Sequence, residues 1–312
     1  MRTESPVIYD NDFMQFFGSK GGWHVFRYDD VQTILNDYQT FSNEYMPMIE
    51  ENPLTRAITQ NDPPFHHQLR MIVAKVFTPR AIENMRPFIE QIADKLIDQI
   101  VDQGKMDVTS DIAIPLPIQV IAKMLGVSHE DQPKFREWSA MLLKQPTDAE
   151  GAEAFLRSQK EMGEYFLDTI EYRKEHPGDD LISLLTQAEV DGKKLETKDL
   201  LAFCITLLVA GNETTTNLIN NSILTFTEFP EVQEHLSSHL EDIPKAIEEV
   251  LRYRSPLQYI NRIAKKDVVV RGQQIKKGDI LNLWIGSANR DESVFPNPDQ
   301  FDLSRTNLKH IA

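Results

Sequence analysis

Hydrophobic residues recur every three or four positions through most of the chain from residue 63 onward. This spacing places them on one face of an α-helix. The clearest case spans residues 82–100, and Gly104 is expected to end that helix. The same pattern predicts helices over residues 63–77, 114–125, 129–143, 149–175, 180–188, 197–229 and 243–254. Asp62 is expected to cap the first of these, with Pro63 and Pro64 in its first turn.

Short β-strands are predicted on both sides of this helical region. Residues 6–9 and 23–28 flank the turn-rich stretch 18–22 and predict a β-hairpin. A short helix should follow it, capped by Asp29 and Asp30, and then a loop over residues 44–60. Residues 259–264, 267–270 and 280–284 predict further strands, and residues 294–312 an ordered loop. The predicted fold class is mainly α with small β-sheets (α+β).

Composition narrows the classes of partner and compartment. The 312 residues carry a net charge of −15, so the surface repels nucleic-acid backbones and anionic membranes. The longest apolar run, residues 200–211, is shorter than the ~20 residues that span a bilayer. The single cysteine, Cys204, can form neither an internal disulfide nor a zinc site by itself, which favours a reducing cytoplasm. No linker composition divides the chain, so one domain over residues 1–312 is expected.

The first candidate site lies in the long apolar helix, at the segment LLVAGNETTT of residues 207–216. Ala210 and Gly211 remove side-chain bulk, so a flat ligand could lie against the backbone. Thr214 can donate to the carbonyl of Ala210 and locally open the helix. Burial would readily shift the protonation of Glu213 beside it, as a proton relay requires. The alternative is a solvated kink in a long helix.

Two other candidates are charged pairs at helical spacing. His66 and Arg70 lie four residues apart, so they share a helix face and could hold one anionic group. The alternative is an ordinary surface pair. Glu249 and Arg252 lie three apart, where a local salt bridge is the default interpretation. A buried version of that pair would need another partner for the charges.

Together these segments resemble the cytochrome P450 family along nearly the whole chain. Residues 210–215, AGNETT, are similar to the family's oxygen-binding motif, and residues 249–252, EVLR, to its E-x-x-R pair. Residues 295–305 are similar to the segment whose final arginine joins that pair, and residues 62–70 to the helix that holds a haem propionate. Residues 77–80, 288–290 and 301–302 resemble the soluble bacterial class of the family.

The resemblance implies a role for each candidate. Glu213 and Thr214 would deliver protons to dioxygen bound at the haem iron, while Ala210 and Gly211 face the haem. The propionates would be held by His66, Arg70, Arg262 and His310, because carboxylates attract cationic donors. Glu249, Arg252 and Arg305 would form a structural network behind the haem. The implied activity is that of a haem-thiolate monooxygenase, which hydroxylates a small apolar substrate with dioxygen.

One family feature is absent from the sequence. The cysteine thiolate that ligates the iron belongs to a loop of the form F-x-x-G-x-x-x-C-x-G, which should begin just after Ala312. Cys204 precedes the AGNETT motif and cannot replace it, so no residue is assigned as a metal ligand. We therefore expect a sequence that stops before the ligand loop, and a 312-residue fragment that binds haem weakly and is inactive. The alternatives are a peroxygenase of the same family or a non-catalytic helical binder of apolar ligands.

The resemblance also implies the electron donors and the substrate class. Electrons would come from NAD(P)H through a separate ferredoxin or flavodoxin with its reductase, and Lys75 and Arg80 could dock that acidic protein. The substrate pocket would be lined by residues 45–59, 142–164, 207–210 and 256–260. Apolar side chains in these ranges predict a fatty acid, terpenoid or steroid-like substrate: Met46, Met48, Leu54, Ile58, Leu257 and Ile260.

Overall fold

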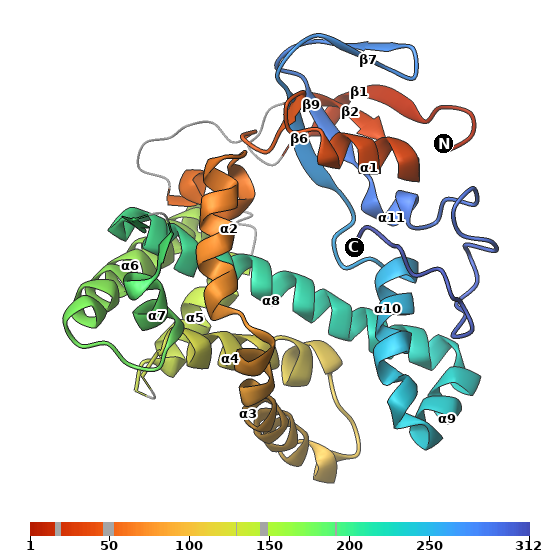
Figure 1. The fold of residues 1–312 in the computed structure, drawn as a ribbon. Coiled ribbons are helices and arrows are strands. Elements are labelled where there is room, and N and C mark those ends of the chain that lie inside the picture. Colours follow the sequence, from red (N-terminus) through yellow and green to blue (C-terminus); the bar gives the residue numbers. More distant parts are fainter. Residues whose placement is uncertain (16–19, 46–52, 129, 144–148, 191) are drawn as a thin grey trace. The chain divides into compact units, whose positions relative to one another are not determined.

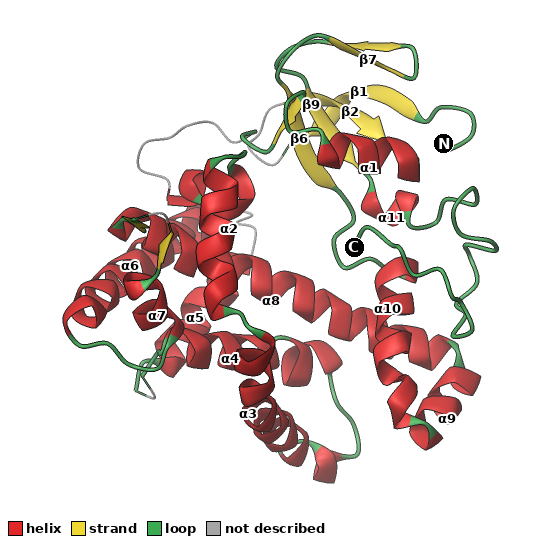
Figure 2. Ribbon diagram, in the orientation of Figure 1, coloured by secondary structure: helices red, strands yellow, loops and turns green. Residues whose placement is uncertain are grey.

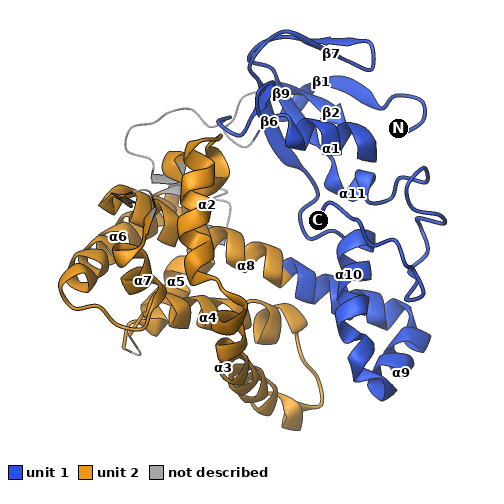
Figure 3. Cartoon of the chain, in the orientation of Figure 1, with its two compact units in different colours: residues 1–47, 217–312 blue, residues 48–216 orange. Residues whose placement is uncertain are grey.

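The computed structural model describes the chain except for residues 16–19, 46–52, 129, 144–148 and 191. It comprises two compact units, residues 1–47 with 217–312 (unit 1) and residues 48–216 (unit 2) (Figure 3). Helices make up most of unit 2, whereas the larger β-sheet belongs to unit 1 (Figure 2). The predicted fold class, mainly α with small sheets, is confirmed.

Unit 1 contains a five-stranded sheet built from both ends of the chain (Figure 1). Its order is β1 (Val7–Met14), β2 (Lys20–Val25), β9 (Ile280–Leu283), β6 (Ile260–Ala264) and β3 (Phe41–Ser42). β2 and β9 run parallel, and the other neighbours are antiparallel. Strands β7 (Val268–Val270) and β8 (Gln273–Ile275) form a separate hairpin. The sheet buries apolar side chains that include Val7, Val25, Phe41, Leu281 and Leu283.

Helix α1 (Tyr28–Asn36) is capped by a residue from the other end of the chain. The Tyr28 amide donates to Asp291 Oδ2 at 3.0 Å. The prediction that Asp29 and Asp30 cap this helix is wrong, because both lie inside its first turn and the N-cap residue is Arg27. In the first turn their charges still favour the positive end of the helix dipole.

The other helices of unit 1 pack beside the last part of the chain. They are α9 (Pro230–Ser238), α10 (Ile243–Tyr253) and the short α11 (Ile285–Ala288). Val232, Leu236, Ala246 and Val250 from α9 and α10 bury Phe301 between them. Residues 294–312 contain no helix or strand, as predicted.

Unit 2 is a bundle of helices with one small hairpin. Its elements are α2 (Phe65–Val76), α3 (Pro79–Asp98), α4 (Pro115–Leu125), α5 (Gln132–Leu143), α6 (Ala149–Glu175), α7 (Leu181–Gln187), β4 (Glu189–Val190) and β5 (Lys193–Lys194). The long helix α8 (Thr197–Glu228) contributes its residues up to 216. No helix in the described part of the chain is long and apolar enough to cross a membrane.

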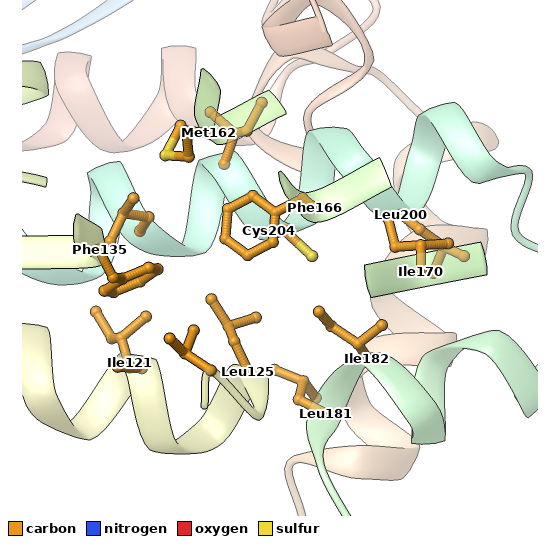
Figure 4. Packing of buried hydrophobic residues seen from close by; sticks show 14 of the residues in the cluster. Ile121, Leu125, Phe135, Met162, Phe166, Ile170, Leu181, Ile182, Leu200 and Cys204 are labelled. Carbon is orange, nitrogen blue, oxygen red and sulfur yellow. The ribbon is translucent and has the colours of Figure 1, made fainter. Parts of the chain in front are cut away.

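The core of unit 2 contains the cysteine. Cys204 on α8 lies among Phe166 and Ile170 of α6 and Leu200 of α8 (Figure 4). Burial raises the pKa of the Cys204 thiol far above its usual value, because the thiolate would lose its hydration. This thiol is therefore an inert part of the core.

The helix periodicity identified the long elements well and their ends less well. The bounds predicted for α6 agree with the structure, but α2 begins at Phe65 and not at residue 63. The N-cap residue of α2 is Pro64, so the prediction that Asp62 is the N-cap residue is wrong. Helix α3 ends at Asp98, before the predicted stop at Gly104. Two short turns, Pro53–Arg56 and Ile58–Gln60, interrupt the predicted loop 44–60.

Asp291 provides a test of the cap on α1. Burial by itself would raise its pKa, but hydrogen bonds from the Ser293 hydroxyl and from the Tyr28 and Ser293 amides outweigh it, so the pKa is lowered. A lowered carboxyl pKa stabilises the fold above the unfolded pKa, and this stabilisation is lost as pH falls through the folded pKa. Asp291→Asn should lower the free energy of unfolding by about 1 kcal/mol at pH 7, and the loss should shrink below about pH 4.

Urea unfolding of the parent protein and of Asp291→Asn at a series of pH values measures this difference. Asp299→Asn is the control, because that carboxylate is 78% exposed in its surface pair with Arg290. It should change the free energy of unfolding by less than about 0.5 kcal/mol. A loss for Asp291→Asn that stayed constant down to acid pH would contradict the proposed charge contribution.

Candidate functional site

The strongest electrostatic feature of unit 1 is a buried pair on α10. Arg252 donates from Nε to Glu249 Oε2 and from Nη2 to Glu249 Oε1, both at 2.8 Å. Neither side chain is accessible to solvent. A two-bond pair of this kind is strong, but burying both charges costs several kcal/mol unless every remaining donor and acceptor is satisfied.

Arg305 supplies the further partner that this pair requires. Its Nε donates to Glu249 Oε1 at 3.2 Å, and the backbone amide of Asp302 donates to the same oxygen at 3.1 Å. Arg305 Nη1 also donates to the carbonyl of Pro296 at 2.8 Å. The structure therefore joins Glu249, Arg252 and Arg305 in one network, although Arg305 lies 56 residues beyond Glu249.

The remaining donors of Arg252 bind the irregular chain after α11. Its Nη1 donates to the carbonyls of Asn289 and Pro298 at 3.0 and 2.9 Å, and its Nη2 to that of Gln300 at 3.0 Å. These carbonyls belong to a segment that has no helix or strand partner to satisfy them. The network thus satisfies several backbone carbonyls between Asn289 and Gln300 as well as its own charges.

In unit 2, the small residues of α8 differ in their surroundings. A Cβ on Gly211 would lie 2.9 Å from Ile121 Cδ1 of α4, so glycine here allows α4 and α8 to pack closely. Ala210 is exposed. The space beside Gly211 is therefore occupied by Ile121 of α4, whereas Ala210 faces solvent. The predicted haem contacts of both residues stay predictions.

Thr214 makes the local hydrogen bond expected from its position. Its Oγ1 donates to the Ala210 carbonyl at 2.7 Å. Helix α8 nonetheless runs without interruption through this segment, so the expectation that the bond opens the helix is wrong. A hydroxyl bond back to the preceding turn is compatible with continuous helix.

The expectation that Glu213 is buried is also wrong. Its buried neighbours are Asn212 and Thr216, and Thr216 Oγ1 donates to the Ala113 carbonyl at 2.9 Å. Glu213 is exposed and Thr214 is half-buried. Because a helix repeats every 3.6 residues, the face that packs through Asn212 and Thr216 turns Glu213 away from the core. The carboxylate can therefore exchange protons with solvent.

His66 and Arg70 lie one turn apart on α2 of unit 2. The pKa of His66 is lowered, first by partial burial and then by the positive charge of Arg70. The four-residue spacing places Arg70 on the same face of α2, so its charge disfavours a protonated His66, while the Asp62 carboxylate acts in the opposite direction. An anion held by both would relieve that repulsion, so the pair suits a carboxylate ligand.

The other two predicted cationic residues belong to unit 1. Arg262 on β6 is buried and donates from Nη1 to the Asn261 carbonyl at 2.8 Å. His310 Nε2 lies 3.0 Å from Glu248 Oε2, and its buried Nδ1 has no hydrogen-bond partner in the described part of the chain. The Glu248 contact was not foreseen, since a Glu–His pair 62 residues apart leaves no local signal.

These residues fit one part of the predicted haem group. Arg70 and Arg262 provide permanent cations for two carboxylates, and His310 Nδ1 is a buried polar atom still without a partner among the described residues. The iron ligand is a different matter, because the Cys204 thiol is enclosed by core side chains. No group of three or more His, Cys, Asp or Glu side chains suited to a metal ion occurs among the described residues.

Comparison with known proteins gives a consistent result. The family model "Cytochrome P450" matches residues 8–142 and 152–309. The putative cytochrome P450 YjiB of Bacillus subtilis is 40% identical over 100% of this chain and 78% of the relative. The erythromycin C-12 hydroxylase of Saccharopolyspora erythraea is 38% identical, covering 98% and 76%.

Solved structures agree with the sequence relatives. Substrate-free CYP109E1 from Bacillus megaterium superposes with a TM-score of 0.93 at 36% identity, over 99% of this chain and 81% of that one. The same enzyme in complex with corticosterone gives a TM-score of 0.89 over 99% and 80%.

The buried network can be tested against an exposed pair of the same spacing. Glu249→Gln would leave two buried arginines facing a neutral side chain, so we expect a loss of about 3–5 kcal/mol in the free energy of unfolding. Glu83→Gln on α3 is the matched control, since Glu83 and Arg86 also lie three apart but are 66% and 63% exposed. That change should leave the free energy of unfolding nearly unchanged, because solvent screens the exposed pair. Equal losses in urea unfolding would refute the importance of the buried network.

Proposed function

Because the chain belongs to the cytochrome P450 family of haem-binding monooxygenases, we propose that it contains the dioxygen-handling and haem-holding residues of an enzyme that hydroxylates a small apolar molecule. The observation that carries this proposal is the acid–alcohol pair on α8. Thr214 keeps its hydroxyl on the Ala210 carbonyl, and the neighbouring Glu213 carboxylate reaches solvent. The family match on both sides of residues 143–151 supports one domain over residues 1–312.

Haem, when bound, supplies the iron at which dioxygen is reduced and its O–O bond is cleaved. The residues of this chain deliver the protons. Glu213 takes a proton from water and passes it toward Thr214, whose hydroxyl can donate one proton while accepting another. The small side chain of Ala210 leaves room beside that hydroxyl. We assign Glu213 and Thr214 as the catalytic pair.

The cationic residues hold the two carboxylates of the cofactor. We propose that His66 and Arg70 bind one propionate from α2, and that Arg262 and the free Nδ1 of His310 bind from unit 1. Arginine suits this task because its planar fork matches a carboxylate and keeps its charge at every physiological pH. The network of Glu249, Arg252 and Arg305 positions the chain next to His310: Asn289 Oδ1 accepts from the Ile311 amide at 2.8 Å.

The substrate proposal rests on apolar residues and on relatives. Leu257 is exposed and Ile260 half-buried near the start of β6, whereas Met46 and Met48 lie outside the described residues. CYP109E1 binds corticosterone in one solved complex. Among fatty acids, terpenoids and steroid-like molecules, we therefore propose a steroid-sized substrate as the first to test.

We propose that electrons come from NAD(P)H through a ferredoxin or flavodoxin with its reductase. Lys75 and Arg80 are the docking candidates, and Lys75 also donates to the Glu189 carbonyl at 2.7 Å. An acidic partner would be attracted to these cations despite the net charge of −15. We propose a cytoplasmic location, because the free, buried thiol of Cys204 is compatible with a reducing compartment.

The unsuitability of Cys204 predicts the spectrum of these 312 residues. The purified chain, incubated with haem, reduced and exposed to carbon monoxide, should lack the absorbance band of thiolate-ligated haem. Cys204→Ala should give the same spectrum as the parent chain. A thiolate band that appears in the parent and disappears in Cys204→Ala would overturn the assignment of Cys204 to the core.

The proton-delivery role of Thr214 is tested in the haem-loaded enzyme, with corticosterone as the probe substrate. Thr214→Ala should lower product formed per NAD(P)H consumed by about tenfold or more, because proton delivery then depends on water alone. Thr227→Ala is the matched control, since Thr227 Oγ1 makes the same bond, to Ile223, at 2.8 Å on an exposed part of α8. Full coupling in Thr214→Ala would refute the relay.

A further inference from the structure

An ion pair in unit 2 joins the segment before α2 to the beginning of α8. Arg56 ends the short turn Pro53–Arg56, and its Nε donates to Asp199 Oδ1 at 2.6 Å. Its Nη2 donates to Glu196 Oε2 at 3.4 Å. Neither contact belongs to the family motifs above, and the two residues lie 143 positions apart.

The two partners differ in burial. The Asp199 side chain is 5% exposed, whereas that of Arg56 is 34% exposed. Asp199 Oδ2 also accepts from the Glu196 amide at 3.2 Å, so this carboxylate caps the first turn of α8 while Oδ1 is bound to Arg56. Removing Arg56 should therefore destabilise the contact more than neutralising Asp199, because an unpaired carboxylate would stay buried whereas the partly exposed Arg56 can be solvated.

The segment that follows Arg56 is partly buried. Ala57 and Gln60 are buried, and Asn61 Nδ2 donates to the Ala57 carbonyl at 2.6 Å. Helix α2, with His66 and Arg70, begins five residues after Gln60. The ion pair therefore fixes the segment that leads into α2, the proposed haem-holding helix. The same segment overlaps residues 45–59, which are proposed to line the substrate pocket.

We propose that Arg56 is a positioning residue for substrate binding, because its pair with Asp199 holds residues 55–60 against the first turn of α8. The link to substrate rests on the proposed function; the holding contact does not. When Arg56 is removed, the buried Asp199 carboxylate loses its cation. Water can then solvate that charge only if residues 55–60 separate from the first turn of α8. When Asp199 is neutralised, Arg56 turns to water at little cost.

This asymmetry gives a test that needs neither haem nor substrate. Amide hydrogen exchange of residues 55–60 should be on the order of tenfold faster in Arg56→Gln than in the parent, the effect of losing one charge-assisted hydrogen bond. Asp199→Asn should accelerate exchange less, and the double variant Arg56→Gln with Asp199→Asn should resemble Asp199→Asn alone. Unchanged exchange in Arg56→Gln, or fully additive effects in the double variant, would overturn the proposed contact.

Lys198→Gln is the matched control. Lys198 pairs with Glu196 at 3.3 Å in the same turn of α8, so its removal deletes a positive charge without touching Asp199. Exchange of residues 55–60 should stay at the parent rate in this variant. Acceleration equal to that of Arg56→Gln would mean that general electrostatics hold the segment and would overturn the role of Arg56.

The substrate link is tested in the haem-loaded enzyme with corticosterone as the probe. Arg56→Gln should raise KM by about tenfold with kcat unchanged, because the contact shapes the binding segment and leaves the proton relay intact. Arg56→Lys should have a KM between those of the parent and Arg56→Gln, since lysine keeps the charge but not both donors. Faster exchange with an unchanged KM would overturn the positioning role. A parent enzyme without turnover would count against the proposed function alone, and the exchange result would still decide the contact.

Discussion

The carboxylate of Glu249, shared by two buried arginines, is the interaction on which the last quarter of unit 1 depends. A single glutamate cannot balance two guanidinium groups, so their other donors bind backbone carbonyls between Asn289 and Gln300. That stretch contains no helix or strand. The two arginine side chains therefore donate to backbone carbonyls that would bind a neighbouring strand in a β-sheet. These hydrogen bonds fix the path of the segment.

Helix α8 separates packing from chemistry by its own geometry. Asn212 and Thr216 are buried, Thr216 donates to the Ala113 carbonyl just before α4, and Gly211 allows Ile121 of α4 to approach. One residue further along, the helix turns Glu213 outward and leaves the Thr214 hydroxyl on the Ala210 carbonyl. A run of polar residues that would be costly in a fully buried helix is thus tolerated, because only part of it is removed from water.

Sequence reasoning succeeded where the signal was local. The period of apolar residues located the long helices, and the three-residue spacing of Glu249 and Arg252 identified their pair. It failed where a partner is distant: Asp291 caps α1 from 263 residues away, and Glu248 meets His310 from 62 away. It also missed α9, and it missed α11 and the hairpin of β4 and β5, which are too short to show a period. Glu213 was expected inside because an apolar run surrounds it, yet the helix period decides which side of that run is buried.

We propose that the side chains of His66, Arg70, Arg262 and His310 hold the carboxylates of a haem, and that Glu213 and Thr214 supply protons for its chemistry. A crystal structure of the haem-loaded enzyme tests this proposal most directly. We expect propionate oxygens within hydrogen-bond distance of Arg70 and Arg262, and the Thr214 hydroxyl near the iron. Propionates that contact none of His66, Arg70, Arg262 and His310, or an iron remote from Thr214, would contradict it.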